Sequence, residues 1–519
     1  MPPTGMTRIV LQMLTTDPAD GLVRSMVSSN AESPRIRAVI ALTVLLPLTL
    51  GAGWLVLDSA RIAATMPVQL NYVDGYTVDD ALRLARGEPL YPDPASAPYT
   101  VTVYTPVFLA ATAALVQLGC DGFVAGRLLV LSSMLGLAAI ILWFGYRRTG
   151  WVAVLVALAL LLHPMQWPWS LVIRPDLAAI FLSVLAVMVV SGTKSRRAIA
   201  ISATLCVVAV FTKQTAAAAP AAILISLLAR DRRGALLFTT AFGLGTMSVA
   251  AALQWASHGQ FFFQTVTANV NPFEIGRAVA MYVRFLATGP LFIAILVVML
   301  VATARRRQLS VVAMYALLSV LTAGAVGKTG SSMNYFLEPL VAVALWAGIE
   351  FPTEWFIRRQ PVRVAIGAVA VLAVLLFSTT SWIDQFKDHR ATRTVAPIHA
   401  NLVQTVSEVE GVVVSDDASL LVAAGKPVHY RPFIMAQLAE AGLWDQGPFL
   451  RELEEGTVAM IIFRTRPIAI HESRYTPAMR EILARRYRLA FRYQLGATFV
   501  ALRPRETQTV IGHPVVGDE

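Results

Sequence analysis

The stretch around which the chain is organised runs from Asn71 to Pro106 and reads NYVDGYTVDDALRLARGEPLYPDPASAPYTVTVYTP. It is polar and acidic, and it is the longest such break in the first two-thirds of an otherwise apolar chain. Its middle predicts a short helix, with Thr77 as the N-terminal cap, Asp80 completing a capping box and Gly87 as the stop. One apolar face recurs at helical spacing, formed by Val78, Ala81, Leu82 and Ala85.

Asp74 is the acidic residue of this stretch for which the sequence offers no local structural role. Asp79 and Asp80 fall in the first turn of the expected helix, where the helix dipole favours carboxylates. Asp74 precedes the expected cap and stands before Gly75. A loop carboxylate held at a membrane surface by an amphipathic helix is a candidate general base or metal ligand. A solvated loop acid is the alternative.

The composition indicates a membrane protein. Of 519 residues, 56% are hydrophobic and only 14% are charged, whereas soluble domains carry about 25% charged residues. Several apolar runs reach the roughly 20 residues that cross a bilayer. The net charge of +11 does not indicate nucleic-acid binding, because most Lys and Arg residues lie in short loops between apolar runs. Two cysteines are too few for a disulfide framework or a zinc site.

The segment Val103–Gly119 decides the expected topology, because it is apolar but short for a span. If it lies on or dips into the outer face of the membrane, every later basic loop falls on the cytoplasmic side. We therefore expect a mainly α-helical, polytopic bundle of about eleven spans. They lie near residues 36–57, 123–146, 151–167, 172–191, 198–213, 216–229, 235–256, 281–303, 309–326, 335–351 and 362–380.

Four regions follow from this pattern. Residues 1–35 are expected to form a cytoplasmic tail, and residues 36–380 the transmembrane domain, in which residues 58–122 form a large external loop. Residues 381–505 read as a small extracytoplasmic α/β domain, and residues 506–519 as a loose tail. In the α/β domain, strands are expected at 411–415, 458–463 and 497–502, and helices at 395–409, 434–443, 448–455 and 477–487.

This topology places the unusual polar residues of the membrane part on the outer side. Ionisable groups near the membrane core are costly and usually functional, so their gathering on one face predicts a single site. Each has a structural alternative: a local ion pair at a helix start, an interfacial aromatic belt, or a lysine that reaches the headgroups. The candidates are Asp74, Tyr104, His163, Arg174, Asp176, Lys213, Gln214, Asn334 and Tyr335.

The order of these elements resembles the GT-C class of membrane glycosyltransferases, in particular bacterial relatives of the protein O-mannosyltransferases and the lipid A aminoarabinose transferases. The matching elements are Tyr72-Val73-Asp74-Gly75-Tyr76, Tyr104-Thr105-Pro106, Arg174-Pro175-Asp176, Thr212-Lys213-Gln214 and Asn334-Tyr335-Phe336-Leu337-Glu338-Pro339. The resemblance covers roughly residues 36–380. The chain departs from the better-known members in having Gly75 where they commonly carry Glu, and in lacking a basic residue before Pro106.

The resemblance implies that a sugar moves from a polyprenyl-phosphate-linked donor to an extracytoplasmic acceptor, which is an envelope glycan, a lipid or a protein. It implies that Asp74 is the base, that Lys213 and Arg174 bind the leaving phosphate, and that the other candidates line the substrate site. A single displacement would invert the anomeric carbon. A divalent metal shared by Asp74 and Asp176 stays open. The implied location is a bacterial cytoplasmic (inner) membrane, with membrane lipid as a partner and no nucleic acid.

Two other classes of function fit the same charges. A transporter or flippase of lipid-linked sugars would use the intramembrane charges as a substrate path and would need no base. A non-catalytic envelope scaffold would use the C-terminal domain as its binding module. The acidic external loop, together with Lys213 and Arg174, favours the enzyme.

Overall fold

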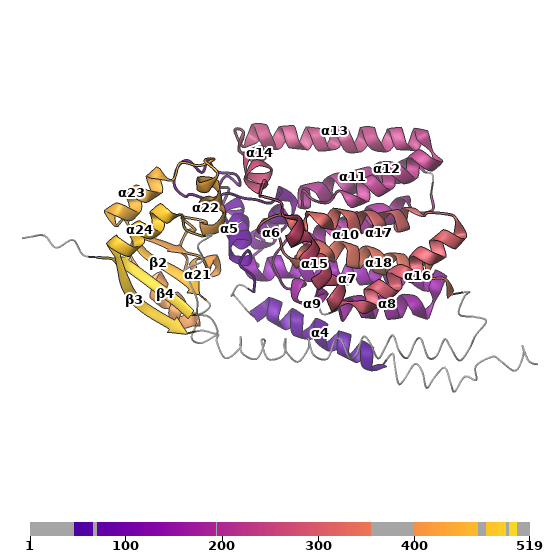
Figure 1. The fold of residues 1–519 in the computed structure, drawn as a ribbon, viewed down its shortest axis with the longest axis horizontal. Helices are drawn as coiled ribbons and strands as arrows, with labels where there is room; N and C mark the ends of the chain where they lie inside the picture. Colours follow the sequence, from indigo (N-terminus) through magenta and orange to yellow (C-terminus); the bar gives the residue numbers. More distant parts are fainter. Residues whose placement is uncertain are drawn as a thin grey trace, which may run out of the picture. The chain divides into compact units, whose positions relative to one another are not determined.

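The computed structural model of this chain describes residues 46–65, 70–163, 165–193, 195–353, 399–465, 474–494 and 498–505. The chain divides into two compact units between Gly53 and Trp54. Helix α4 (Leu46–Thr65) runs across this division, and all other described elements belong to the second unit (Figure 1). The expected tails at residues 1–35 and 506–519 and the expected span at 362–380 lie outside the described residues, so these assignments and the domain boundaries stay predictions.

The fold is mainly helical, at 69%, with one small mixed sheet. After α4 the membrane part runs in the order α5 (Asp74–Ala85), α6 (Pro106–Gln117), α7 (Gly122–Thr149), α8 (Trp151–Leu161), α9 (Gln166–Trp169), α10 (Asp176–Val190), α11 (Arg196–Thr212), α12 (Ala218–Arg230), α13 (Arg232–Ala256), α14 (Gln260–Thr265), η2 (Thr267–Asn269), α15 (Ile275–Thr288), α16 (Pro290–Arg306), α17 (Val311–Thr322), η3 (Ala323–Gly327), η4 (Met333–Phe336) and α18 (Leu337–Glu350).

Two of the described helices, α7 and α13, are long and apolar enough to cross a membrane. A third span is present if α15 and α16 count as one broken crossing. Five further apolar helices are shorter, at 10–17 residues. The expected number of about eleven spans therefore stays a prediction.

Two expected spans are interrupted in the structure. The span expected over 281–303 is bent, because α15 and α16 meet there at 94°, and whether the pair forms one broken span or a re-entrant loop stays open. The break falls at Gly289 and Pro290, the residue types that least support a continuous helix. The helix expected over 151–167 is interrupted in its second half. Helix α8 already ends at Leu161, shortly before a proline in the sequence that disfavours helical geometry in the residue preceding it.

The short segment that decided the topology forms α6, a helix of 12 residues. Pro106 occupies its first turn, where the missing N–H costs nothing. At about 1.5 Å per residue the helix is roughly 18 Å long, well below the roughly 30 Å of a hydrocarbon core. Helices α8, α12 and α17 are of similar length and lie in expected spans, so the placement of α6 at the membrane surface stays a prediction.

Helix α5 begins four residues earlier than the sequence suggested, because its N-cap is Val73 and not Thr77. Its first residue is Asp74, and Thr77 lies inside the helix with its hydroxyl donating back to the Val73 carbonyl at 3.0 Å. The predicted capping box is therefore wrong. Asp79 and Asp80 are also not exposed first-turn carboxylates, since both are buried in the middle of the helix. Tertiary ion pairs account for them, as described below.

The C-terminal part forms the predicted α/β fold. Residues 399–407 are helical and are followed by β1 (Val412–Ser415), α21 (Ala418–Ala423), α22 (Pro432–Glu440), α23 (Gly447–Glu455), β2 (Val458–Thr465), α24 (Pro477–Arg486), β3 (Tyr487–Gln494) and β4 (Thr498–Pro504). The strand order is β1-β2-β4-β3, with β1 parallel to β2 and the other pairs antiparallel. Strand β3 and helix α21 were not expected. The alternation of Tyr487, Leu489, Phe491 and Tyr493 was the missed signal for β3.

This module and the loop that carries α5 share their cores. One core cluster joins Tyr76 of α5 to Leu402, Val413 and Leu420, and a second joins Tyr99 to Tyr430 and Phe449. The backbones also pair, since Tyr99 N donates to His429 O at 2.8 Å and Arg431 N donates to Tyr99 O at 3.2 Å. The module therefore packs directly on the polar stretch that organises the chain.

Candidate functional site

A cavity of about 540 Å³ lies where the first external loop, several helix ends of the membrane part and α22 meet. Such a volume is within the usual range for small-molecule sites. Seven of the candidates drawn from the sequence contribute to its wall or to the polar cluster beside it. They are Tyr104, Arg174, Asp176, Lys213, Gln214, Asn334 and Tyr335.

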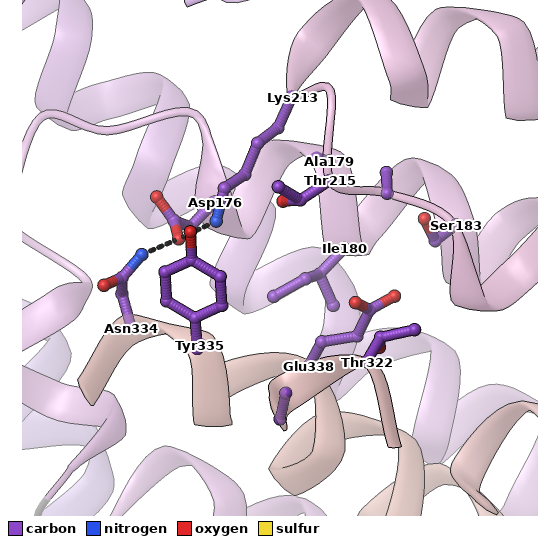
Figure 2. A pocket seen from close by; sticks show the side chains of 12 residues that line it. Asp176, Ala179, Ile180, Ser183, Lys213, Thr215, Thr322, Asn334, Tyr335 and Glu338 are labelled. Atoms are coloured by element: carbon purple, nitrogen blue, oxygen red, sulfur yellow. Dashed lines mark hydrogen bonds and ion pairs between the residues drawn. The ribbon is translucent and has the colours of Figure 1, made fainter. Parts of the chain in front are cut away.

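Asp176 is the centre of the polar cluster. Its Oδ1 atom accepts from Lys213 Nζ at 2.5 Å and from Asn334 Nδ2 at 2.6 Å. Its Oδ2 atom lies 3.4 Å from Arg174 Nε. Figure 2 shows Lys213 and Asn334 reaching the carboxylate from two sides, with the Tyr335 ring beside them. At 3% exposure, Asp176 is buried and its charge is met by protein donors alone among the described residues.

Aromatic rings hold the two cations of the cluster. Lys213 Nζ lies 5.1 Å from the centre of the Tyr335 ring, and the Arg174 guanidinium lies 5.5 Å from that of Trp169 and 6.0 Å from that of Tyr104. These distances are typical of cation–π contacts. Burial raises the pKa of Tyr104 to about 12, so its ring stays neutral at physiological pH. Arg174 and Lys213 both line the cavity.

The charges of the cluster do not cancel. Arg174 and Lys213 carry two positive charges and Asp176 one negative charge, which leaves one positive charge at this end of the cavity. Lys328 also lines the wall, and its Nζ reaches only the Asn269 carbonyl at 3.5 Å among the described residues. A partly dry site with surplus positive charge favours an anion such as a phosphate.

A second, smaller cavity of about 30 Å³ adjoins the first. The two share Lys213, Thr215, Asn334 and Tyr335 as a common wall. Glu338 enters the small cavity from α18 (Figure 2) and accepts a hydrogen bond from Tyr315 Oη at 3.1 Å. The volume suits one or two water molecules, and much of its lining is polar. Sequence reasoning placed Glu338 in a motif but gave it no role.

Asp74 occupies a different position from the one that the sequence suggested. It is fully buried and does not line the cavity. Its Oδ2 atom accepts from Leu70 N at 2.8 Å and Asn71 N at 3.1 Å, and its Oδ1 atom accepts from Ile173 N at 2.9 Å. Burial raises the pKa of Asp74, against the opposing effects of Arg127 and the three N–H groups. Since Ile173 precedes Arg174, this carboxylate ties the external loop to the backbone beside the cluster.

Arg431 is a site residue that sequence reasoning missed. It is 4% exposed and reaches from the C-terminal module to the external helix, where it binds both carboxylate oxygens of Asp80. It also donates to the Val101 carbonyl at 2.8 Å and lies 3.6 Å from Asp79 Oδ2. Arg83 completes the network at 2.5 Å from Asp80 Oδ1. No local signal links position 431 to positions 79 and 80, which lie some 350 residues away.

Of the two candidates Gln214 and His163, the first lines the large cavity and the second lines neither cavity. Gln214 lines the cavity, and its amide ties together two segments by donating to Val103 O at 2.9 Å and Thr265 O at 3.2 Å. His163 does not line either cavity, and its Nδ1 accepts from Met165 N at 3.2 Å. The substrate contact of His163 therefore stays a prediction, and its ring nitrogen is bound by the Met165 N–H in this structure.

The carboxylates that the sequence left open as shared metal ligands both bind protein N–H groups instead. Asp74 accepts only backbone donors, and Asp176 accepts from Lys213 and Asn334. Among the described residues, no group of three or more His, Cys, Asp or Glu side chains is arranged to hold a metal ion.

The sequence matches no protein-family model and no curated protein at a significant level. Solved structures do match. ArnT from Cupriavidus metallidurans bound to undecaprenyl phosphate has a TM-score of 0.58 at 15% identity, over 88% of this chain and 97% of that chain. The apo state of ArnT has a TM-score of 0.57 at 15% identity, over 88% and 98%. The oligosaccharyltransferase of Archaeoglobus fulgidus reaches 0.49 at 13% identity, over 86% and 72%.

ArnT is a lipid A aminoarabinose transferase of the GT-C class. The match to it extends over 88% of this chain and 97% of that chain. At 15% identity such a match reports the fold. The chain therefore has the GT-C fold, as its sequence motifs predict.

Proposed function

We propose that this chain is a membrane glycosyltransferase that moves a sugar from a polyprenyl-phosphate carrier to a hydroxyl group of an extracytoplasmic acceptor. The observation that carries the proposal is the cationic cluster of Arg174 and Lys213 around Asp176, on the wall of a ligand-sized cavity. The GT-C fold supports it, and so does the undecaprenyl phosphate bound by ArnT.

In this proposal the cluster binds the phosphate of the carrier. Transfer breaks the bond between the anomeric carbon and the phosphate oxygen, and that oxygen takes the electron pair. Arg174 and Lys213 stabilise the charge that develops there, and the guanidinium is able to bind two phosphate oxygens at once. Asp176 holds both cations in place, and Asn334 and Tyr335 hold Asp176 and Lys213 from the other side.

The acceptor hydroxyl attacks the anomeric carbon from the opposite face, which inverts its configuration if there is one displacement. Its proton passes to a carboxylate. The family resemblance assigns this step to Asp74. In the present conformation Asp74 positions Ile173 and the neighbouring Arg174, so its action as a base requires one of its three N–H partners to give way to the hydroxyl.

A transfer assay in reconstituted vesicles tests the proposal. Polyprenyl phosphates carrying one radiolabelled sugar at a time are supplied to the wild type, to Lys213→Met and to Arg86→Gln. Arg86 is a control, because its exposed side chain pairs only with Glu88 among the described residues. Transfer by the wild type and the control, and not by Lys213→Met, is expected. If the carrier lipid crosses the bilayer and keeps its sugar, the result supports a flippase. If neither sugar transfer nor lipid crossing occurs, the non-catalytic scaffold is the alternative that remains.

Asp74→Asn separates the two roles of Asp74, because both predict a loss of transfer but only one predicts a loss of carrier binding. The asparagine side chain has an NH2 group in place of one of the two carboxylate oxygens. The variant therefore loses at least one of the hydrogen bonds from Leu70 N, Asn71 N or Ile173 N. If Asp74 is the base, undecaprenyl phosphate binds the variant as it binds the wild type. If Asp74 positions Arg174, binding of undecaprenyl phosphate weakens together with transfer. Retained transfer would remove Asp74 from both roles.

A further inference from the structure

Helix α22 of the C-terminal module supplies part of the wall of the large cavity. Phe433, Ile434 and Gln437 line it from this helix, and Arg431 lines it from the residue before the helix. None of these residues lines the small cavity beside the cationic cluster. The large cavity therefore has one end built by the membrane part and another end built by α22 together with the external helix α5.

This α22 wall is held firmly on two sides. On the α5 side, Arg431 binds Asp80 and Asp79, and Phe433 N donates to Tyr72 Oη at 3.3 Å. On the other side the Phe433 ring meets the backbone at Gly330, where an added Cβ would lie 3.2 Å from the ring. A wall that is fixed in this way can discriminate between ligands, because its side chains need little ordering when a ligand binds.

The two ends of the cavity differ in charge. At the α22 end the positive charge of Arg431 is met by Asp80 and Asp79, and Arg83 balances the second carboxylate. Two positive and two negative charges cancel there. The remaining α22 side chains on the cavity are uncharged, and the Tyr72 hydroxyl accepts from Phe433 N while the Arg474 guanidinium covers the Tyr72 ring. The other end keeps the surplus positive charge of the Arg174, Lys213 and Asp176 cluster. It also keeps that of Lys328, whose Nζ reaches Asn269 O, and the Asn269 amide shares the Val103 carbonyl with Gln214.

We infer that the α22 wall is the acceptor subsite and that it selects a neutral carbohydrate. The C–H face of a sugar ring packs against an aromatic ring such as that of Phe433, while an amide such as that of Gln437 binds its hydroxyls. A charged acceptor would lose its hydration there without a free counter-charge, which is costly. This inference rests on the proposed function, because it divides the same cavity into a phosphate end and an acceptor end.

Saturation-transfer difference NMR on the full chain in lipid nanodiscs tests the subsite with two matched probes. Methyl β-D-glucopyranoside and methyl β-D-glucuronide share one ring and differ in charge. The neutral glycoside is expected to bind, and the glucuronide to bind about tenfold or more weakly. Gln437→Ala and Phe433→Leu are expected to weaken the neutral glycoside, and Glu440→Gln, at an exposed position of the same helix, to leave it unchanged.

Binding of undecaprenyl phosphate to the same samples separates the two proposals. It is expected to persist in Gln437→Ala and Phe433→Leu, which also shows that these variants are folded, and to be lost in Lys213→Met. Carrier binding without glycoside binding, equal binding of the two glycosides, or binding that neither α22 variant changes would overturn the acceptor subsite while leaving the proposed function in place. Failure of the wild type to bind undecaprenyl phosphate would overturn the proposed function itself.

Discussion

Asp176 and Lys213 illustrate what single residues contribute to this site. They lie 37 positions apart in the sequence and meet at 2.5 Å with side chains 3% and 14% exposed. The sequence alone leaves a local ion pair open for Asp176 and a headgroup contact open for Lys213. The pairing removes that alternative for this conformation, because the ammonium is directed at the carboxylate and at the Tyr335 ring.

The pair predicts a thermodynamic cycle. Lys213→Met leaves Asp176 with Arg174 and Asn334 alone, and removal of one partner from a buried ion pair typically costs about 3–5 kcal/mol. The double variant Lys213→Met/Asp176→Asn removes both partners of the pair, so its loss of thermal stability is expected to be smaller than the sum of the losses in Lys213→Met and Asp176→Asn. Its transfer activity is not expected to recover, because the cation that faces the phosphate is gone. Thermal unfolding and transfer assays on the four proteins check both statements, and additive losses of stability would contradict the pairing.

At the scale of elements, Gly75 explains a departure from the family pattern. In the structure α21 packs against α5 at this position. A Cβ on Gly75 would lie 2.2 Å from Ser419 N and 2.6 Å from Ala418 C, which are backbone atoms that cannot easily move. A larger side chain is excluded for the same reason. The absence of Glu after Asp74 is therefore a requirement of helix packing.

This packing predicts opposite effects for two glycine-to-alanine changes. In an isolated helix, alanine is favoured over glycine by about 0.5–1 kcal/mol. Gly243→Ala in α13, where nothing lies within 4 Å of the added Cβ, is expected to follow that rule. Gly75→Ala is expected to destabilise the fold by about 1–3 kcal/mol through overpacking. Thermal unfolding of the two purified variants compares them, and equal effects would show that α21 does not contact α5 closely.

The buried Asp416, which follows the carboxyl end of β1, predicts that the stability of the fold depends on pH. Burial raises the pKa of Asp416 to about 6, although Arg474 and the Arg464 N–H oppose the shift. Between its ordinary value near 4 and 6, the folded state binds more protons at this group than the unfolded state does. This contribution to stability is therefore present at low pH and is lost as pH rises through about 6. Asp416→Asn is expected to reduce the change of melting temperature between pH 5 and pH 7.5. The same change in the variant and in the wild type would show that Asp416 does not cause the pH dependence.

At the scale of the whole molecule, the open question is how often the chain crosses the membrane. The positive-inside pattern places the C-terminal module outside and the loop at Arg305–Arg307 inside. Alkaline phosphatase fused after residue 505 is expected to be active, since its disulfides form outside the cytoplasm, and green fluorescent protein fused there to be dark. Fusions after Arg307 are expected to show the reverse. A fluorescent fusion after residue 505 would contradict the odd number of spans.

The sequence by itself determined the class of the protein and most of its elements. Apolar runs, turn residues and the Arg-rich loops are local signals, and they predicted a helical membrane part followed by an α/β module. They also selected Arg174, Asp176, Lys213 and Asn334, because polar residues at the ends of apolar segments are unusual enough to be noticed one at a time.

Only the tertiary structure decided how these residues act together. Asp74 accepts a hydrogen bond from Ile173, and Asp80 forms its ion pair with Arg431. Position 75 requires glycine because α21 packs against it. The α22 wall of the cavity likewise comes from a module more than 300 residues away from α5. These are contacts between segments far apart in the chain, whose pairing depends on the packing of the whole fold and leaves no periodic trace in either segment.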